Sequence, residues 1–205
     1  MLTASDVNNM KQRKIAALNA LKFFTDIKDI KSSNTQGFNY PIENDIIGAY
    51  RKQRPRSIMG SFADAAKTGA GNCAELSAIV YASLFGNPRI IDNSMVAICH
   101  LEVDHTIVLV TDKYAPLSII GWNNFNKFSQ TTMVVDPWTR DCYFPNLDPI
   151  LAYAYSLDTI PLLTPWQIEI RKWCKTSKFR FYHKTPILPP KESGIYGQGC
   201  NMVVL

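Results

Sequence analysis

Cys73 is the residue of this sequence best placed to act as a nucleophile. It stands between a glycine-containing turn, residues 68–72 (TGAGN), and an apolar run, residues 74–85 (AELSAIVYASLF). A helix that begins at Cys73 would offer unpaired backbone N–H groups and a partial positive charge, and both favour a thiolate. Gly69 and Gly71 would let the backbone approach a ligand closely, and the Cys73 amide could donate to an oxyanion. The alternative is a small buried cysteine packed under a helix.

Two further side chains could complete a catalytic triad with Cys73. His105 begins an apolar, β-branched run that ends at residue 111, and Asp136 closes the run of residues 131–135 (TTMVV). A thiolate needs an imidazole beside it, both as an ion-pair partner and as the acid that protonates the leaving group. A carboxylate at the end of the next strand can hold the second ring nitrogen and fix the tautomer. Considered individually, each residue also has a non-catalytic interpretation: His105 could be a structural histidine, and Asp136 could be a turn residue before proline.

The other histidines are weaker candidates, and we expect no metal or cofactor. His100 lies within an apolar stretch, and His183 lies in a basic aromatic segment that suggests a surface position. Cys99, His100, Asp104 and His105 are close in sequence and could suggest a metal site. On a strand, however, Cys99 and His100 would point to opposite faces of the sheet, so they could not share an ion.

Three segments together, GNCAELSAIVYASL, DHTIVLV and TMVVDPW, resemble the transglutaminase-like branch of the papain-like cysteine enzymes. The resemblance covers about residues 69–138, and the DPW ending is similar to that of bacterial members, including secreted effectors. It implies that Cys73 is the nucleophile, His105 the general base and acid, and Asp136 the orienting carboxylate. It also implies a buried helix carrying the cysteine, packed on a small antiparallel sheet.

The sequence departs from papain-type proteases just before the cysteine. Those enzymes carry a glutamine a few residues upstream, whereas residues 68–72 contain none. Gln53 and Asn72 are therefore the candidates for the second donor to an oxyanion.

Composition and cysteine usage bound the class of protein. The chain has 205 residues, 46% of them hydrophobic and 19% charged, which excludes disordered, collagen-like and coiled-coil classes. The five cysteines are scattered and include no CxxC pair. This pattern favours reduced thiols over a disulfide framework or a structural zinc site. We expect no transmembrane segment and no Sec signal peptide, because the sequence lacks a long apolar run and an apolar N-terminal core.

Charge is distributed unevenly along the chain. Residues 1–60 and 161–205 each carry a net charge of +5, whereas residues 61–160 carry −5. Basic flanks can contact nucleic acid or an anionic membrane, or simply be solvated. No nucleic-acid-binding motif is present, so we expect a protein substrate rather than a nucleic acid, and the oligomeric state stays open.

The pattern of apolar residues and turn signals predicts an α+β fold in a single domain, residues 1–205, and the resemblance implies that this domain is papain-like. Within it we expect a helical N-terminal extension (1–60), a catalytic core (61–145), and C-terminal helices and tail (146–205). The expected helices are 5–31 (capped by Ser5, with Val7, Ile15, Leu18 and Leu21 on its apolar face), 42–50, 62–67, 74–85, 147–156 and 165–174. The expected strands are 89–91 with 95–100, 104–111 and 131–135, and a Pro/Gly-rich tail follows from residue 185.

These features lead to two hypotheses about function. The first is a cysteine-dependent acyl-transfer enzyme that acts on protein amides as a glutamine deamidase, a transglutaminase or a protease. The second is a catalytically inactive papain-like scaffold that binds a protein partner. The missing signal peptide and the resemblance to effectors imply a cytoplasmic protein of the producing cell, delivered into a host cell by a non-Sec route.

Overall fold

The computed structural model describes residues 2–22, 30–32, 41–53, 58–90, 94–112, 123–158 and 163–184. The helices are α1 (Ala4–Lys22), α2 (Pro41–Gln53), α3 (Ile58–Thr68), α4 (Cys73–Leu84), α5 (Pro149–Ala154) and α6 (Pro165–Thr176), with a short 3-10 helix, η3 (Phe125–Lys127). The strands are β1 (Ser94–Leu101), β2 (His105–Asp112), β3 (Asn123–Asn124), β4 (Met133–Asp136), β5 (Asp141–Tyr143) and β6 (Lys178–Lys184). This is an α+β fold, as the sequence predicts.

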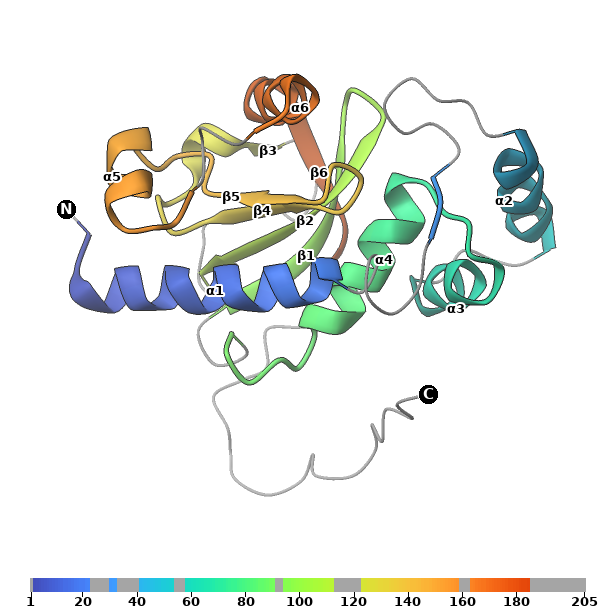
Figure 1. The fold of residues 1–205 in the computed structure, drawn as a ribbon, viewed down its shortest axis with the longest axis horizontal. Helices are drawn as coiled ribbons and strands as arrows, with labels where there is room; N and C mark the ends of the chain where they lie inside the picture. Colours follow the sequence, from blue (N-terminus) through green and yellow to red (C-terminus); the bar gives the residue numbers. More distant parts are fainter. Residues whose placement is uncertain are drawn as a thin grey trace.

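The six strands form one antiparallel sheet in the order β3-β6-β1-β2-β4-β5. Helices α1 and α4 lie on one side of this sheet and α6 lies on the other, while α2 and α3 lie together at one end of the molecule (Figure 1). Strand β6, the last of the described strands along the chain, pairs with β1 in the interior of the sheet. One neighbour of β1 is therefore a segment distant from it in sequence.

Alternating residues of the strands fill two separate cores. Val96, Ile98 and Val108 belong to the core that also contains apolar residues of α1 and α4. Ala97 and Leu109 belong to the second core, together with residues of η3, α6 and β6. Because both faces of the central strands are covered, these strands appear in the sequence as continuous apolar runs rather than alternating ones.

Helix α1 buries a different face from the one predicted. Ile15 and Leu18, which we expected to face the core, are 40% and 43% exposed. The face that is buried is made of small residues, a methionine, a leucine and an arginine: Met10, Arg13, Ala16, Ala17, Ala20 and Leu21. The prediction was wrong because it weighted large apolar side chains, whereas alanines allow the helix to pack closely on its neighbours.

The N-terminus of α1 is capped by Thr3 and not by Ser5. The Thr3 hydroxyl accepts a hydrogen bond from the Asp6 amide (3.1 Å), and the Asp6 carboxylate accepts one from the Thr3 amide (2.8 Å). This reciprocal arrangement satisfies two of the backbone donors left open at a helix start. Part of the predicted helix 5–31, residues 23–29, lies outside the described residues.

Other predicted elements differ in extent. Residues 89–90 form a turn and do not belong to the first strand, which begins at Ser94. Strands β3, β5 and β6 were not predicted from the sequence. His183 lies in β6 opposite Ile98, and its side chain is outside the described residues, as is the predicted tail from residue 185. None of the helices in the described ranges is both long and apolar enough to cross a membrane.

Arg13 anchors α1 to the ends of the strands. Its side chain is almost fully buried and donates hydrogen bonds to the Ser94 hydroxyl (2.9 Å), the Thr131 carbonyl (2.6 Å) and the Asp112 carboxylate (2.7 Å). Partial burial raises the pKa of Asp112, but hydrogen bonds from the Thr131 hydroxyl, Arg13 and the Ser129 hydroxyl, together with the charge of Arg13, outweigh burial and hold this pKa below its usual value. A buried arginine with this many partners fixes the helix in one position on the sheet.

We predict that Arg13→Met lowers the free energy of unfolding by about 3 kcal/mol, because it leaves buried hydrogen-bond acceptors without a donor. Urea denaturation would measure the change. Lys11→Met removes a positive charge from an exposed position of the same helix. It should change stability by less than about 0.5 kcal/mol. Equal effects of the two substitutions would contradict the anchoring role of Arg13.

Candidate catalytic site

Cys73 is the first residue of α4, as the sequence predicts, and its side chain is half-buried. The turn before it is tied to a neighbouring segment, because the Lys31 amide donates to the Gly69 carbonyl (2.9 Å) and the Gly71 amide donates to the Lys31 carbonyl (3.0 Å). The Tyr50 hydroxyl adds a hydrogen bond to the Ala70 carbonyl (3.2 Å). The start of α4 is thus held in place by contacts from two earlier segments.

The two glycines of this turn have structural roles. Gly69 adopts a positive φ of 71°, a conformation that favours glycine. A Cβ atom on Gly71 would lie 3.0 Å from the Glu75 Cβ and 3.4 Å from the Ala65 Cβ. Gly71 therefore allows the backbone to pack closely against side chains of α3 and α4. This packing explains the glycine without a ligand.

Helix α4 is fastened to the strand that carries the histidine. The Ser77 hydroxyl, fully buried, donates a hydrogen bond to the Thr106 carbonyl (3.0 Å). Ser77 lies one helical turn after Cys73, and Thr106 is next to His105. This bond brings the N-terminal half of α4 to the beginning of β2.

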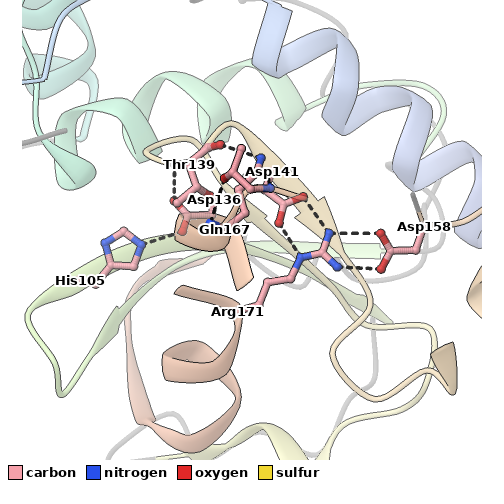
Figure 2. Close-up of polar contacts among 8 residues, drawn as sticks. His105, Asp136, Thr139, Asp141, Asp158, Gln167 and Arg171 are labelled. Carbon is pink, nitrogen blue, oxygen red and sulfur yellow. Dashed lines mark hydrogen bonds and ion pairs between the residues drawn. The ribbon is translucent and has the colours of Figure 1, made fainter. Parts of the chain in front are cut away.

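His105 and Asp136 form a buried pair in the structure. The Nε2 atom of His105 lies 2.9 Å from Oδ2 of Asp136, and both side chains are at most 5% exposed (Figure 2). The other carboxylate oxygen of Asp136 accepts hydrogen bonds from the amides of Trp138 (3.0 Å) and Thr139 (3.3 Å). The carboxylate therefore shapes the turn after β4 and holds the imidazole at the same time.

The electrostatic surroundings of His105 favour its protonated form. Burial lowers the pKa of His105, but the charge of Asp136 and the hydrogen bonds with Asp136 and the Cys73 thiol outweigh burial and raise it to about 10. Since Nε2 faces Asp136, Nδ1 is the ring nitrogen that remains for Cys73. In the structure His105 thus pairs with Asp136, and the Cys73 thiol is near enough to influence the pKa of the imidazole.

Trp138 covers this pair and was not assigned a role from the sequence. Its ring centroid lies 5.0 Å from that of His105, and Trp166 of α6 packs edge-on against Trp138, also at 5.0 Å. Trp138 contacts both cores of the protein. The rings exclude water from the His105–Asp136 bond, and a lower local dielectric strengthens such a bond. The DPW sequence was the available signal, because a tryptophan two residues after a buried aspartate lies in the same turn.

Cys174 of α6 lies behind the pair. One potential metal-binding atom from each of His105, Asp136 and Cys174 falls within 4.8 Å of the others, and all three residues are buried. Burial raises the pKa of Cys174 to about 12, so this thiol stays protonated at neutral pH. A metal ion here would require loss of that proton and rupture of the His105–Asp136 bond, so the geometry fits a polar network better than a metal centre.

The four residues weighed as a metal site in the sequence do not converge. Cys99 is fully buried and burial raises its pKa strongly, whereas the His100 side chain is 30% exposed. The His100 Nε2 atom lies 3.9 Å from the carboxylate of Asp104, which is fully exposed.

Helix α6 supports the turn that contains Asp136. Arg171 donates two hydrogen bonds to Asp141 (2.6 and 2.9 Å) and two to Asp158 (2.7 and 3.2 Å), as Figure 2 shows. Asp141 pairs with Asp136 across β4 and β5. The side-chain amide of Gln167 donates a hydrogen bond to the Thr139 carbonyl (3.2 Å), which fixes the turn after β4 at Thr139.

The candidates for a second oxyanion donor remain predictions. Asn72 is the N-cap residue of α4, and its side-chain oxygen accepts a hydrogen bond from the Ser32 hydroxyl (3.2 Å). Gln53 is the last residue of α2, and its side chain lies outside the described residues.

Comparisons of the sequence with known proteins found no matching family model, no matching curated protein and no matching solved structure. The interpretation of the site therefore depends on its own geometry.

The raised pKa of His105 predicts a specific dependence of stability on pH. The pKa of His105 is near 6.5 in the unfolded chain and about 10 in the folded protein, so between these pH values the folded protein binds one proton more than the unfolded chain. The resulting contribution to the free energy of unfolding is complete below about pH 6.5 and disappears as pH approaches about 10. A Cys73→Ala protein keeps the larger effect of Asp136 but lacks the raising effect of the thiol, so we expect it to lose a few kcal/mol of unfolding free energy as pH rises from about 6.5 to below 10.

Urea denaturation at several pH values would measure this loss. Adding His105→Gln to the Cys73→Ala protein should flatten the dependence, whereas adding His100→Gln should leave it unchanged. Parallel curves for the proteins with and without His105 would contradict the prediction.

Proposed function

We propose that the protein is a cysteine-dependent enzyme that transfers acyl groups from protein amides, with Cys73 as nucleophile, His105 as general base and acid, and Asp136 as the orienting carboxylate. The observation that carries the proposal is the position of His105, which binds a buried Asp136 through Nε2 (2.9 Å) and whose pKa is raised in part by the Cys73 thiol at the start of α4. A helix that begins with the cysteine, beside an antiparallel sheet, supports the resemblance to transglutaminase-like and papain-like enzymes.

The reaction follows from these contacts. His105 is protonated before the substrate arrives, and the Cys73 thiolate paired with it attacks the carbonyl carbon of an amide to form a C–S bond. As the tetrahedral intermediate collapses, the C–N bond breaks and His105 gives its proton to the departing nitrogen. A water molecule or an amine, deprotonated by the now neutral His105, then attacks the thioester; the C–S bond breaks and the Cys73 thiolate is released beside protonated His105.

The acceptor and the type of amide decide which reaction results. Water acting on a glutamine side chain gives deamidation, an amine gives transglutamination, and a backbone amide as donor gives proteolysis. These three reactions use the same triad, so the proposal covers all three. The resemblance to secreted effectors leads us to propose also that the protein is made in a bacterial cytoplasm and delivered into a host cell by a route other than the Sec pathway.

We predict that Cys73→Ala abolishes turnover and leaves the fold intact, because the thiol is half-buried and its loss creates only a small void. Intact mass spectrometry of candidate substrate proteins would follow the reaction. Deamidation adds about one dalton, transglutamination adds the amine minus ammonia, and proteolysis splits the chain. Full activity of purified Cys73→Ala would exclude the assignment.

A second prediction concerns the reactivity of the thiol and separates the enzyme from an inactive scaffold. Cys73 should react with iodoacetamide faster than Cys99, Cys142 or Cys174, since these three are buried, and burial raises the pKa of Cys142 and Cys174 to about 12. His105→Ala should move the pH of half-maximal Cys73 labelling upward by more than Asp136→Asn does.

The two variants should also differ in turnover, with Asp136→Asn reducing it roughly 10- to 10³-fold through disorder of the imidazole. Circular dichroism would confirm that each variant is folded. If neither substitution changes the labelling of Cys73, the three residues do not act together and the scaffold hypothesis becomes the better one.

A further inference from the structure

Arg51, in the last turn of α2, forms a two-pronged contact with Glu75 of α4. Its Nε atom donates to one carboxylate oxygen (2.8 Å) and its Nη2 atom donates to the other (2.7 Å). The same carboxylate accepts a hydrogen bond from the Asn72 amide (3.1 Å), which caps α4. Glu75 thus holds the guanidinium group in one orientation at the first turn of this helix.

The arginine lies at the end of α4 that carries the nucleophile proposed above. One oxygen of Glu75, Oε2, accepts from both Arg51 Nη2 (2.7 Å) and the amide of Asn72 (3.1 Å), the residue directly before Cys73, so the guanidinium lies at the N-terminus of α4. The pKa of Arg51 is raised, first by its hydrogen bonds with Glu75 and, against a lowering by burial, also by the charges of Glu75, Tyr50 and Cys73.

Arg51 retains capacity to bind another anion. A guanidinium carries five N–H donors, and Glu75 takes two of them through Nε and Nη2. The Glu75 side chain is only 5% exposed, whereas that of Arg51 is 31% exposed, so solvent and solutes reach the arginine but not its partner. A guanidinium fixed by a buried carboxylate is pre-organised for a second carboxylate, because little freedom is lost on binding.

We propose that Arg51 binds a carboxylate group of the substrate next to the amide attacked by Cys73, so that the enzyme selects acidic substrates. This inference rests on the proposed role of Cys73. A purely structural role, clamping α2 to α4, would leave the charge of the substrate without effect. The carboxylate could belong to an acidic side chain or to a chain terminus, and the chemistry of recognition is the same for both.

Two reagents of nearly equal size test the inference without knowledge of the substrate. Iodoacetate carries a carboxylate and iodoacetamide does not; with either one, the Cys73 sulfur displaces iodide and forms a C–S bond. For each thiol we compare the rate of its reaction with iodoacetate to the rate of its reaction with iodoacetamide. We expect this ratio to be at least tenfold higher for Cys73 than for the thiol of glutathione. We also expect the rate of the reaction between Cys73 and iodoacetate to saturate as the iodoacetate concentration rises.

The decisive variant is the double substitution Arg51→Met with Glu75→Gln. It removes the ion pair without changing net charge, and the glutamine oxygen can still accept from the Asn72 amide. The rate ratio should fall to within about threefold of that of glutathione, whereas Lys11→Met, which removes an exposed charge from α1, should leave it unchanged. Arg51→Lys serves as a second variant if the double variant does not fold, and its single ammonium should lower the ratio at least threefold.

The outcomes separate this inference from the proposed function. If Cys73 reacts rapidly with iodoacetamide in a His105-dependent way but the rate ratio does not depend on Arg51, the arginine inference is wrong and the proposed function stands. If Cys73 is as slow as the buried cysteines towards both reagents, the proposed function fails as well.

Protection from iodoacetamide distinguishes the source of the carboxylate. Stronger Arg51-dependent protection by N-acetylglutamic acid α-amide supports an acidic side chain, and stronger protection by N-acetylglutamine supports a chain terminus. Protection that is the same with and without Arg51 would overturn the inference.

Discussion

The buried bond between His105 and Asp136 is the interaction on which the arrangement of this protein depends. An imidazole and a carboxylate removed from water are costly unless each is fully paired. The fold meets this requirement with two backbone amides on the free oxygen of Asp136 and with Trp138 packed over the ring. The position of β4 relative to β2, and the conformation of the turn after β4, are therefore constrained by a single polar contact.

That contact is supported from both sides of the sheet. On one side Ser77 fastens α4 to β2, which places Cys73 near the histidine. On the other side Arg171 fastens α6 to β5 and thereby to the strand that ends at Asp136. A displacement of either helix would change the geometry around His105. Helices α4 and α6 thus help to set the distances between the residues of the candidate site.

The residues of the candidate triad and the elements that carry them could be predicted from sequence, because each lies at a boundary where an apolar run meets turn signals. The helix at Cys73 and the strands at His105 and Asp136 are confirmed. Strand β6 was missed although Phe179 and Phe181 alternate with charged residues, since its basic side chains suggested a solvated surface. Strand β5 has three residues, too few for a periodic pattern.

Features that depend on contacts distant in sequence could not be predicted. Arg13 on α1 resembles an ordinary surface charge in the sequence, and only the acceptors from three other segments explain its burial. The pairing of Arg51 with Glu75 joins two helices separated by a whole third helix. In both cases the sequence shows only a charged residue, and its tertiary contacts determine whether it is solvated or forms an ion pair within the protein.

The interior position of β6 affects the order in which the sheet can form during synthesis. β6 is the last strand to be synthesised, yet it lies between β3 and β1 and is the strand through which β3 joins the sheet. Until residue 184 has left the ribosome, β1 has an open edge and the second core lacks Phe179. A nascent chain that already contains Cys73, His105 and Asp136 still lacks this strand. The sheet and the second core are therefore completed only when synthesis of the described fold is finished, and until then the open edge of β1 is available for pairing with another strand.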